Sequence, residues 1–388
     1  MKMVLRVAVL FLFFCGSALF FAAAAEEGTG PSFSEIQIPD WAESAIRETY
    51  TRFETWRGGD ETVVIPLVTD LHSGRGKITF PIDWSDSKYH ILLAERTAEI
   101  FGADCMADLG DIGFDRLPNW TPSDLQTAND RLESQAELYG AAPVPVFFCI
   151  GNHDSGRAYG NVFSERKVSA AEYGSLFNGK TCERGIDFVS SPNLDYGYWD
   201  IPGKKCRLFF LNTSDGGETG YSDDQMIFLR DALASADGKT VIILQHICLH
   251  PAIGAWYGSF PSGFFRNQAS CIRMLKSFVR HEKGGTDPLA WDFTDGKGGS
   301  LAGVISGDSH FNAQVRQFGV NYVITQGYGT VQPENLPEEC VYLNFDRSEQ
   351  MLCDVAAVKP KTGEMKIFRV GAGGAEQDRV FHFEPAAE

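Results

Sequence analysis

The sequence is short of basic residues: 34 Lys and Arg stand against 51 Asp and Glu, a formal net charge of −17. A field of that sign repels the phosphate backbone of DNA and RNA, so we expect no binding to a nucleic-acid polymer. An acidic protein that handles an anionic substrate needs a local source of positive charge. A bound metal ion is a compact way to supply it.

Closely spaced cysteine pairs are also missing. Nine cysteines occur, but none are spaced as in a CxxC motif or a zinc ribbon. Cys149 lies inside an apolar run and is expected to be buried, and the single disulfide that we consider joins Cys182 to Cys206. No internal repeat or low-complexity segment follows residue 26. The composition, 44% hydrophobic with 40 Gly, is that of an ordinary globular protein of one or two domains.

The N-terminus has the pattern of a signal peptide. Lys2 and Arg6 precede the apolar run 7–21, and small residues at 23–25 form a cleavage site. We therefore predict a signal peptide at 1–25, export to the periplasm or the extracellular space, and no stable membrane span after cleavage. The alternative is a retained anchor, because residues 7–25 carry no charge and could just cross a bilayer.

Apolar runs alternate with helix-like stretches along the rest of the chain. Runs without polar alternation are typical of strands buried on both faces, and the alternation predicts an α/β fold. A hairpin at 196–201 and 206–211, and short strands at 341–345, 355–358, 365–370 and 380–383, make a mixed sheet the better prediction. The predicted core strands are 63–69, 103–109, 144–150, 207–212, 241–245 and 301–306, and the predicted helices are 87–101, 123–139, 223–235 and 267–281.

Metal-binding residue types follow five of these strands. In α/β sheets, ligands bind beyond the carboxyl ends of the strands. Asp, His and Asn side chains gathered there suit a divalent metal ion. The residues are Asp70 and His72, then Asp111, then Asn152, His153 and Asp154, then His246, and finally Asp308 and His310.

This order of motifs resembles the calcineurin-like metallophosphoesterase family, whose pattern is D-x-H, G-D, G-N-H-[DE], a His after a strand, and G-H-x-H. The resemblance spans about residues 62–325. It implies two mixed sheets packed as a sandwich and flanked by helices, with two divalent metal ions (Mn, Fe or Zn) at one edge. We divide the chain into the signal peptide, an N-terminal helical lead-in at 26–60, a catalytic domain at 61–330, and a C-terminal β-rich extension at 331–388 packed on the same domain.

The resemblance also implies roles for individual residues. The first metal would be held by Asp70, His72, Asp111 and His310, and the second by Asp111, Asn152, His246 and Asp308. Asp308 departs from the family pattern, which has His there. A carboxylate is shorter and adds a negative charge, so we expect a working second site with a shifted metal preference.

The predicted activity is hydrolysis of a small phosphate monoester or diester by a metal-bound hydroxide. His153 would protonate the leaving group and Asp154 would orient its imidazole. Asn152, His153 and His250 are the expected substrate contacts, with His250 an alternative metal ligand. The rival hypothesis is a binding protein that keeps one metal and recognises a phosphorylated ligand without cleaving it.

Two branches of the family fit less well. Purple acid phosphatases have a Tyr three residues after the bridging Asp, where this chain has Phe114. The 5′-nucleotidases carry a long second domain, and too few residues follow the resemblance here. Aromatic residues near the predicted site could stack on a base or a sugar, although packing is their commoner role: Trp120, Trp256, Tyr257, Phe260, Phe264 and Phe265.

Overall fold

The computed structural model describes residues 38, 40–72, 84–113, 122–154, 168–214, 219–253, 265–294, 298–327 and 352–386. Residues Ile38–Glu388 form one compact unit, to which the following refers. The predicted signal peptide at 1–25 and the predicted strand at 341–345 lie outside the described residues. No helix in the described ranges is long and apolar enough to span a membrane.

Two large sheets form the centre of this unit. The six-stranded sheet has the order β15-β14-β13-β1-β2-β3 and the seven-stranded sheet the order β11-β12-β10-β7-β6-β5-β4. Strands of the first are β1 (Val63–Val68), β2 (Met106–Asp108), β3 (Val146–Phe148), β13 (Leu352–Lys359), β14 (Glu364–Gly371) and β15 (Arg379–His382). Strands of the second are β4 (Val189–Ser190), β5 (Gly197–Asp200), β6 (Cys206–Leu211), β7 (Thr240–Gln245), β10 (Ser300–Ser306), β11 (Ala313–Gln317) and β12 (Val320–Ile324).

Both sheets are mixed. Strands β1, β2 and β3 are parallel, as are β6, β7, β10 and β12, whereas β13 to β15 and the edge strands β4, β5 and β11 run antiparallel to their neighbours. The predicted hairpin is present as β5 and β6, which pair antiparallel. A separate two-stranded ribbon joins β8 (Lys283–Gly284) to β9 (Trp291–Asp292).

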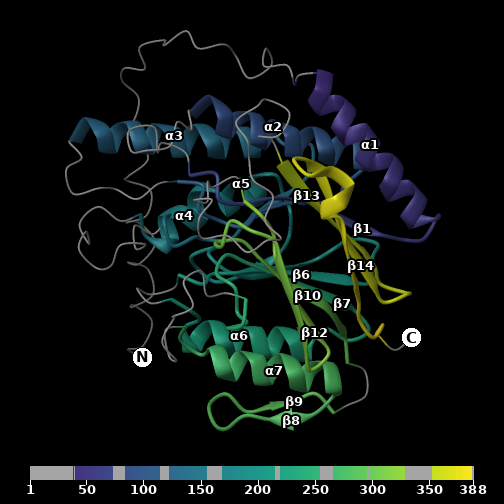
Figure 1. The fold of residues 1–388 in the computed structure, drawn as a ribbon. Helices are drawn as coiled ribbons and strands as arrows, with labels where there is room; N and C mark the ends of the chain where they lie inside the picture. Colours follow the sequence, from purple (N-terminus) through teal and green to yellow (C-terminus); the bar gives the residue numbers. More distant parts are fainter. Residues whose placement is uncertain are drawn as a thin grey trace, which may run out of the picture. The chain divides into compact units, whose positions relative to one another are not determined.

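Helices cover the outer faces of both sheets. Figure 1 shows α1, α2 and α3 on one side and α6 and α7 on the other, with the two sheets between them. Local signals fix some helix starts: Ser169 and Glu172 form a capping box for α4, and Ser222 caps α6. The helices are α1 (Asp40–Arg57), α2 (Trp84–Phe101), α3 (Pro122–Gly140), α4 (Ala170–Leu176), α5 (Asn178–Glu183), α6 (Asp223–Ala234), α7 (Gln268–Arg280) and the 3₁₀ helix η5 (Gly374–Gln377).

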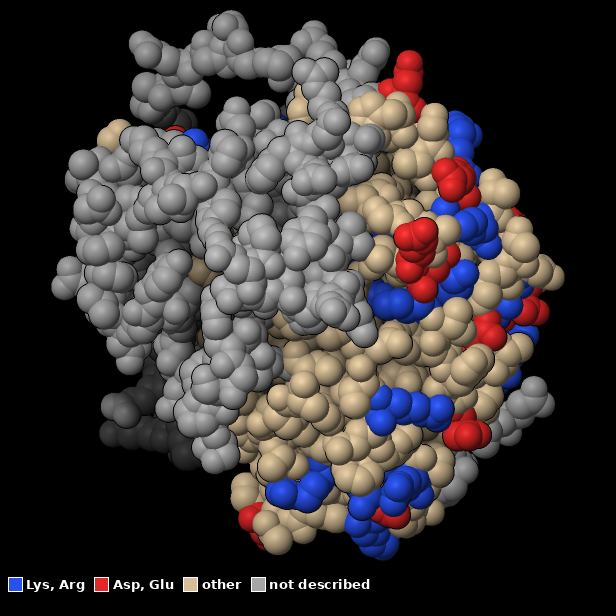
Figure 2. Space-filling view, in the orientation of Figure 1, with Lys and Arg blue, Asp and Glu red and all other residues tan. Residues whose placement is uncertain are grey.

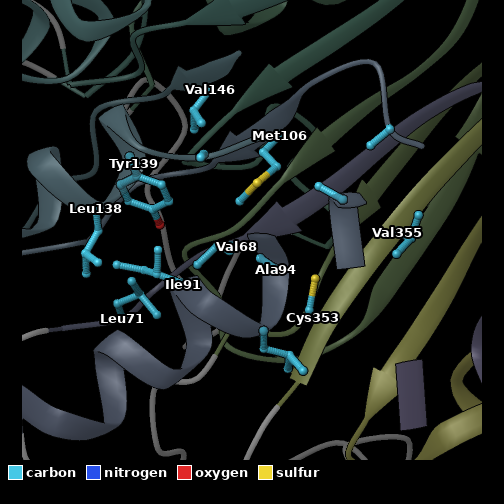
Figure 3. Packing of buried hydrophobic residues seen from close by; sticks show 14 of the residues in the cluster. Val68, Leu71, Ile91, Ala94, Met106, Leu138, Tyr139, Val146, Cys353 and Val355 are labelled. Atoms are coloured by element: carbon cyan, nitrogen blue, oxygen red, sulfur yellow. The ribbon is translucent and has the colours of Figure 1, made fainter. Parts of the chain in front are cut away.

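Strand β1 shows how the layers are packed. Its alternate side chains Val63, Ile65 and Leu67 face the other sheet, while Val64 and Val68 pack beneath the helices. Figure 3 shows the cluster beneath the helices, where strand residues such as Val68 contact side chains from α2 and α3. A third cluster lies between the seven-stranded sheet and helices α6 and α7. Every face of the central strands is therefore apolar and buried, which confirms the predicted helix-flanked sandwich.

Among the residues coloured in Figure 2, acidic and basic side chains lie next to one another on the right side of the view. Several pairs join separate elements. Asp378 accepts from Arg52 of α1 at 3.3 Å and lies 3.2 Å from Lys366 of β14. The C-terminal strands are thus tied to the N-terminal helix as well as to β1.

Candidate metal centre

The loops that carry the predicted ligands are joined by backbone hydrogen bonds. They follow β1, β2 and β3 in one sheet and β7 and β10 in the other, all at carboxyl ends of parallel strands. Asp70 N donates to Gly110 O at 2.9 Å, and Gly307 N donates to His246 O at 2.9 Å. The loops of each sheet are therefore held together before any side chain is considered.

One group of ligands contains Asp70, His72 and His310. His310 Nε2 lies 3.1 Å from Asp70 Oδ1 and 3.0 Å from His72 Nε2. All three have ligand atoms within 4.8 Å of one another. With metal–ligand bonds of about 2.1 Å, neighbouring ligands lie about 3.0 Å apart in octahedral and about 3.4 Å apart in tetrahedral coordination. The group has the spacing of a coordination sphere.

A second group surrounds His246. Its Nδ1 lies 2.8 Å from Leu109 O, which can only accept, so Nδ1 carries the proton and Nε2 is left to face the site. Nε2 then lies 3.0 Å from Asn152 Oδ1, 3.2 Å from Asp111 Oδ2 and 3.5 Å from Asp308 Oδ1. Three oxygens and one imidazole nitrogen therefore converge here.

Asp111 lies between the two groups. Its Oδ2 is 3.2 Å from His246 Nε2 and 3.8 Å from both His72 Nε2 and His153 Nε2. Its Oδ1 accepts from the backbone N–H of His153 at 2.8 Å. One carboxylate oxygen thus contacts imidazoles of both groups, as a carboxylate shared by two cations would.

The donor set fits a pair of divalent cations. Asp70 Oδ1 and Asp111 Oδ2 are buried, and neither accepts a hydrogen bond from the described residues. A buried carboxylate oxygen without a donor is costly, and a metal ion would satisfy it. His72 Nε2 and His310 Nε2 lie 3.0 Å apart, so the two imidazoles could both coordinate one cation in their neutral forms.

Five of the predicted ligands have left-handed backbone conformations. Positive φ is uncommon outside glycine and costs about 1–3 kcal/mol when a structure holds it in place. The loops also approach closely, since a Cβ on Gly151 would lie 2.1 Å from Asp111 Oδ1. The φ values are 57° for Asp70, 46° for His72, 57° for Asp111, 66° for Asp308 and 57° for His310.

Electrostatics couple the ligands without a metal. Burial raises the pKa of Asp111, but His246, His153 and His72 outweigh this and hold it well below its ordinary value. Burial lowers the pKa of His246, but Asp111 and Asp308 outweigh this and raise it well above its ordinary value. Metal ligands must be deprotonated, so cations and protons compete for these side chains and metal binding depends on pH.

The structure gives Asp154 different contacts from those expected. Its two oxygens accept from the backbone N–H groups of Asp111, Gly113 and Gly151 at 2.8–2.9 Å and from Tyr173 Oη at 2.7 Å. These four bonds fill the acceptor sites of the carboxylate. Asp154 therefore joins the loops after β2 and β3, in place of the predicted orientation of His153.

The two other histidines proposed for catalysis or binding lie in different surroundings. The His153 ring packs edge-on against His72, with centroids 4.7 Å apart, and its side chain is 14% exposed at the centre's border. His250 is buried, with Nε2 3.0 Å from Gln317 Oε1 and Nδ1 accepting from Ala252 N. Both nitrogens of His250 are therefore engaged within the protein, outside the metal-ligand groups found among the described residues.

Comparisons with known proteins find likeness in structure alone. No protein-family model matches the sequence, and no curated protein resembles it in sequence. A dimetal phosphatase from Danio rerio matches with a TM-score of 0.53 and 14% identity, over 83% of this chain and 99% of that one. This chain has the metallophosphoesterase fold. The Danio rerio protein therefore confirms the predicted architecture.

Two further solved structures resemble this metallophosphoesterase fold more weakly. A purple acid phosphatase from yellow lupin (Lupinus luteus) seeds has a TM-score of 0.46 and 14% identity, over 83% of this chain and 53% of that one. GAP50, the anchor in the inner membrane complex of Plasmodium, has a TM-score of 0.45 and 10% identity, over 84% of this chain and 90% of that one.

Sequence reasoning missed the residues that lie behind the candidate metal centre and support it. Asp108 accepts from Gly110 N at 2.9 Å and from Tyr139 Oη at 2.6 Å, and so braces the turn before Asp111. One signal was available for Asp108, since a carboxylate inside an apolar strand needs a partner. Tyr139 and Tyr173 lie on helices and carry no such signal.

Other predictions lie away from the centre or outside the described residues. Phe265 packs against Tyr221 in the core. Cys182 is exposed and Cys206 is buried, and both are free thiols, so the disulfide considered between them is not formed. Cys149 is buried as predicted. Phe114 and the other aromatic residues considered lie outside the described residues: Trp120, Trp256, Tyr257, Phe260 and Phe264.

Proposed function

We propose that this protein is an exported phosphoesterase that uses two divalent cations to hydrolyse a small phosphate ester. The observation that carries the proposal is the position of Asp111, whose Oδ2 faces imidazoles of two ligand groups from opposite sheets. A pair of divalent cations supplies Lewis acidity toward a phosphoryl group and activates water. The shared fold with a dimetal phosphatase supports the same conclusion.

The charge of the loops supports a role for metal in substrate binding. The loops hold the carboxylates of Asp70, Asp111, Asp154 and Asp308, so without cations they would repel a phosphate ester. Bound cations would reverse the local field within an acidic protein. The stretches without any Lys or Arg are 69–72, 109–113, 149–154, 246–250 and 307–312.

His153 is the proposed general acid. Its backbone is fixed by the bond to Asp111 Oδ1, while its ring stays partly exposed beside the ligands. A proton held on its imidazole can pass to the leaving alkoxide of a bound ester. Asn152, which precedes it, offers a neutral oxygen to the second group and leaves the loaded centre cationic.

The two metal positions differ in their donors. The first combines carboxylates with two imidazoles, whereas the second has one imidazole, His246, among oxygens from Asp111, Asn152 and Asp308. Oxygen-rich sets favour harder ions such as Mn²⁺ and Mg²⁺ over Zn²⁺. We therefore propose that Asp308 makes the second position the harder of the two.

A chromogenic ester assay tests the activity. A panel of monoesters and diesters, assayed with each divalent ion in turn, should show hydrolysis that chelation abolishes and Mn²⁺ or Zn²⁺ restores. His153→Ala should lower turnover about 100-fold or more while bound metal is retained. Full activity after exhaustive chelation would refute the proposal, and unchanged turnover in the variant would remove His153 from the acid role.

Export rests on the sequence of residues 1–25. Expression of the full chain with sequencing of the mature N-terminus tests it: a protein outside the cytoplasm that begins near residue 26 supports cleavage, and an intact N-terminus in the membrane fraction supports the anchor.

The alternative function, a binding protein with a single metal ion, is supported by one feature, the carboxylate of Asp308. Metal counting separates it from the enzyme.

A further inference from the structure

Arg369 is a fully buried cation behind the candidate centre. It lies on β14, in the C-terminal strands, and is 0% exposed. Its Nε donates to Asp354 Oδ1 at 2.6 Å, and Nη2 lies 3.3 Å from Asp354 Oδ2. This ion pair satisfies only part of a guanidinium that has five N–H donors, so the remaining donors are free to hold other groups.

Two of the remaining bonds reach two loops of the other sheet, and Nη1 also donates to Ala372 O at 3.2 Å, just after β14. Nη2 of Arg369 donates to Asn312 Oδ1 at 3.2 Å, and Nη1 donates to Gln326 Oε1 at 3.3 Å. Asn312 Oδ1 also accepts from Gln326 N at 3.0 Å, and its Nδ2 donates to Gln377 Oε1 at 2.7 Å. Arg369 therefore connects the loop after β10 with the loop after β12.

Both loops belong to the first metal position. Asn312 follows the ligand His310 by two residues. Gln326 precedes Gly327, where an added Cβ would lie 2.5 Å from Asp70 Cβ. The loop after β12 therefore packs directly on Asp70, another ligand of the first metal position. The two ligand atoms, His310 Nε2 and Asp70 Oδ1, are 3.1 Å apart. A shift of either loop would change this distance.

We propose that Arg369 is a positioning residue that sets the geometry of the first metal position through Asn312 and Gln326. The inference rests on the proposed function. Under this proposal the C-terminal strand β14 contributes to the metal centre, because the buried guanidinium group of Arg369 keeps His310 aligned with Asp70. Lysine cannot replace it, because a single ammonium group cannot span Asp354 and both loops.

Arg379 provides a matched control. It also binds Asp354, with Nη2 3.0 Å from Oδ2, but its other bond goes to the backbone oxygen of Ile324 within β12. Arg379→Lys therefore disturbs the same buried carboxylate without removing a bond to Asn312 or to the Gln326 side chain. Asn312→Ala makes the opposite change: it removes the bond from Arg369 Nη2, along with those to Gln326 N and Gln377 Oε1, and leaves Arg369 paired with Asp354.

The test is calorimetric titration of Mn²⁺ into the metal-free full chain, with the melting temperature measured alongside and no substrate present. We expect two sites in the original protein, and about tenfold weaker binding at one of them in Arg369→Lys and in Asn312→Ala. Arg379→Lys should lower the melting temperature and leave both affinities within about twofold. The Asn312 variant decides the matter should Arg369→Lys not fold.

Three outcomes separate the possibilities. Weaker Mn²⁺ binding in both Arg369→Lys and Asn312→Ala, with unchanged binding in Arg379→Lys, supports positioning by Arg369. Equal Mn²⁺ affinities in all four proteins would overturn it while leaving the proposed function intact. No Mn²⁺ binding by the original protein would overturn the proposed function and this inference together.

Discussion

His72 Nε2 and His310 Nε2 lie 3.0 Å apart, although 238 positions separate the two residues in the chain. His72 follows β1 of one sheet and His310 follows β10 of the other. A cation bound between them would join the two sheets of the sandwich at this edge. Metal binding and folding stability are then linked, since a ligand of the folded state stabilises it.

Metal removal should therefore destabilise the protein. Mn²⁺ at about 100 times its dissociation constant should add about 2.7 kcal/mol to the free energy of unfolding for each site. A thermal scan with and without chelator measures this as a fall in melting temperature. An unchanged melting temperature on metal removal would separate the centre from the stability of the sandwich.

Asp308→His should change metal selectivity. A second imidazole beside His246 makes the second position softer, so the ratio of Zn²⁺ to Mn²⁺ affinity should rise by about tenfold or more. Competition titrations followed by mass spectrometric metal counting measure the ratio. Asp292→Asn, at an exposed position of the ribbon strand β9, is the control and should leave the ratio unchanged. Equal ratios in Asp308→His and the original protein would show that residue 308 does not choose the ion.

Asp154→Asn should loosen the loops after β2 and β3. An amide has one oxygen where the carboxylate has two, so buried N–H groups among those of Asp111, Gly113 and Gly151 lose their acceptor. We expect a loss of about 2–4 kcal/mol in denaturant unfolding. Tyr173→Phe, which removes one of the four bonds, should cost about 1 kcal/mol. Similar losses in the two variants would contradict the role given to the carboxylate.

Glu95 should make stability depend on pH. Burial raises its pKa from 4.5 to about 7, and its Oε1 accepts no hydrogen bond from the described residues. Because the pKa is higher in the folded state, the group's stabilising contribution is complete below pH 4.5 and is lost as pH rises through 7.

The matching variant is Glu95→Gln, which stays neutral at every pH. It should be more stable than the original protein at pH 8, by up to about 3 kcal/mol, and the difference should vanish near pH 4. Unfolding by denaturant at both pH values measures this. A difference of the same size at both would assign the effect to packing.

Much of the sandwich could be predicted because its strands are buried on both faces. Apolar runs such as 241–245 and 301–306 reappear almost unchanged as β7 and β10, and the helix predicted at 267–281 is α7. Polar residues directly after buried apolar runs indicated a functional site. The structure brings the ligand atoms of three of them, Asp70, Asp111 and His246, within 4.8 Å of one another.

What could not be predicted depends on contacts between distant segments. The carboxylate of Asp154 could accept a hydrogen bond from an imidazole or from backbone amides. The fold places three backbone N–H groups around it, and it accepts from those. His250 follows β7 by a few residues, as a ligand might, but the chain turns it toward Gln317 of β11. Arg369 lies about 60 residues beyond the last predicted ligand, and only strand pairing places it behind His310.

Anomalous scattering from a crystal grown with Mn²⁺ tests the account most directly. We predict two manganese peaks, one among Asp70, His72 and His310 and the other beside His246, with Asp111 contacting both. A single peak would favour the binding protein over the enzyme. No peak at these side chains, or peaks elsewhere, would contradict the metal centre on which the proposed function depends.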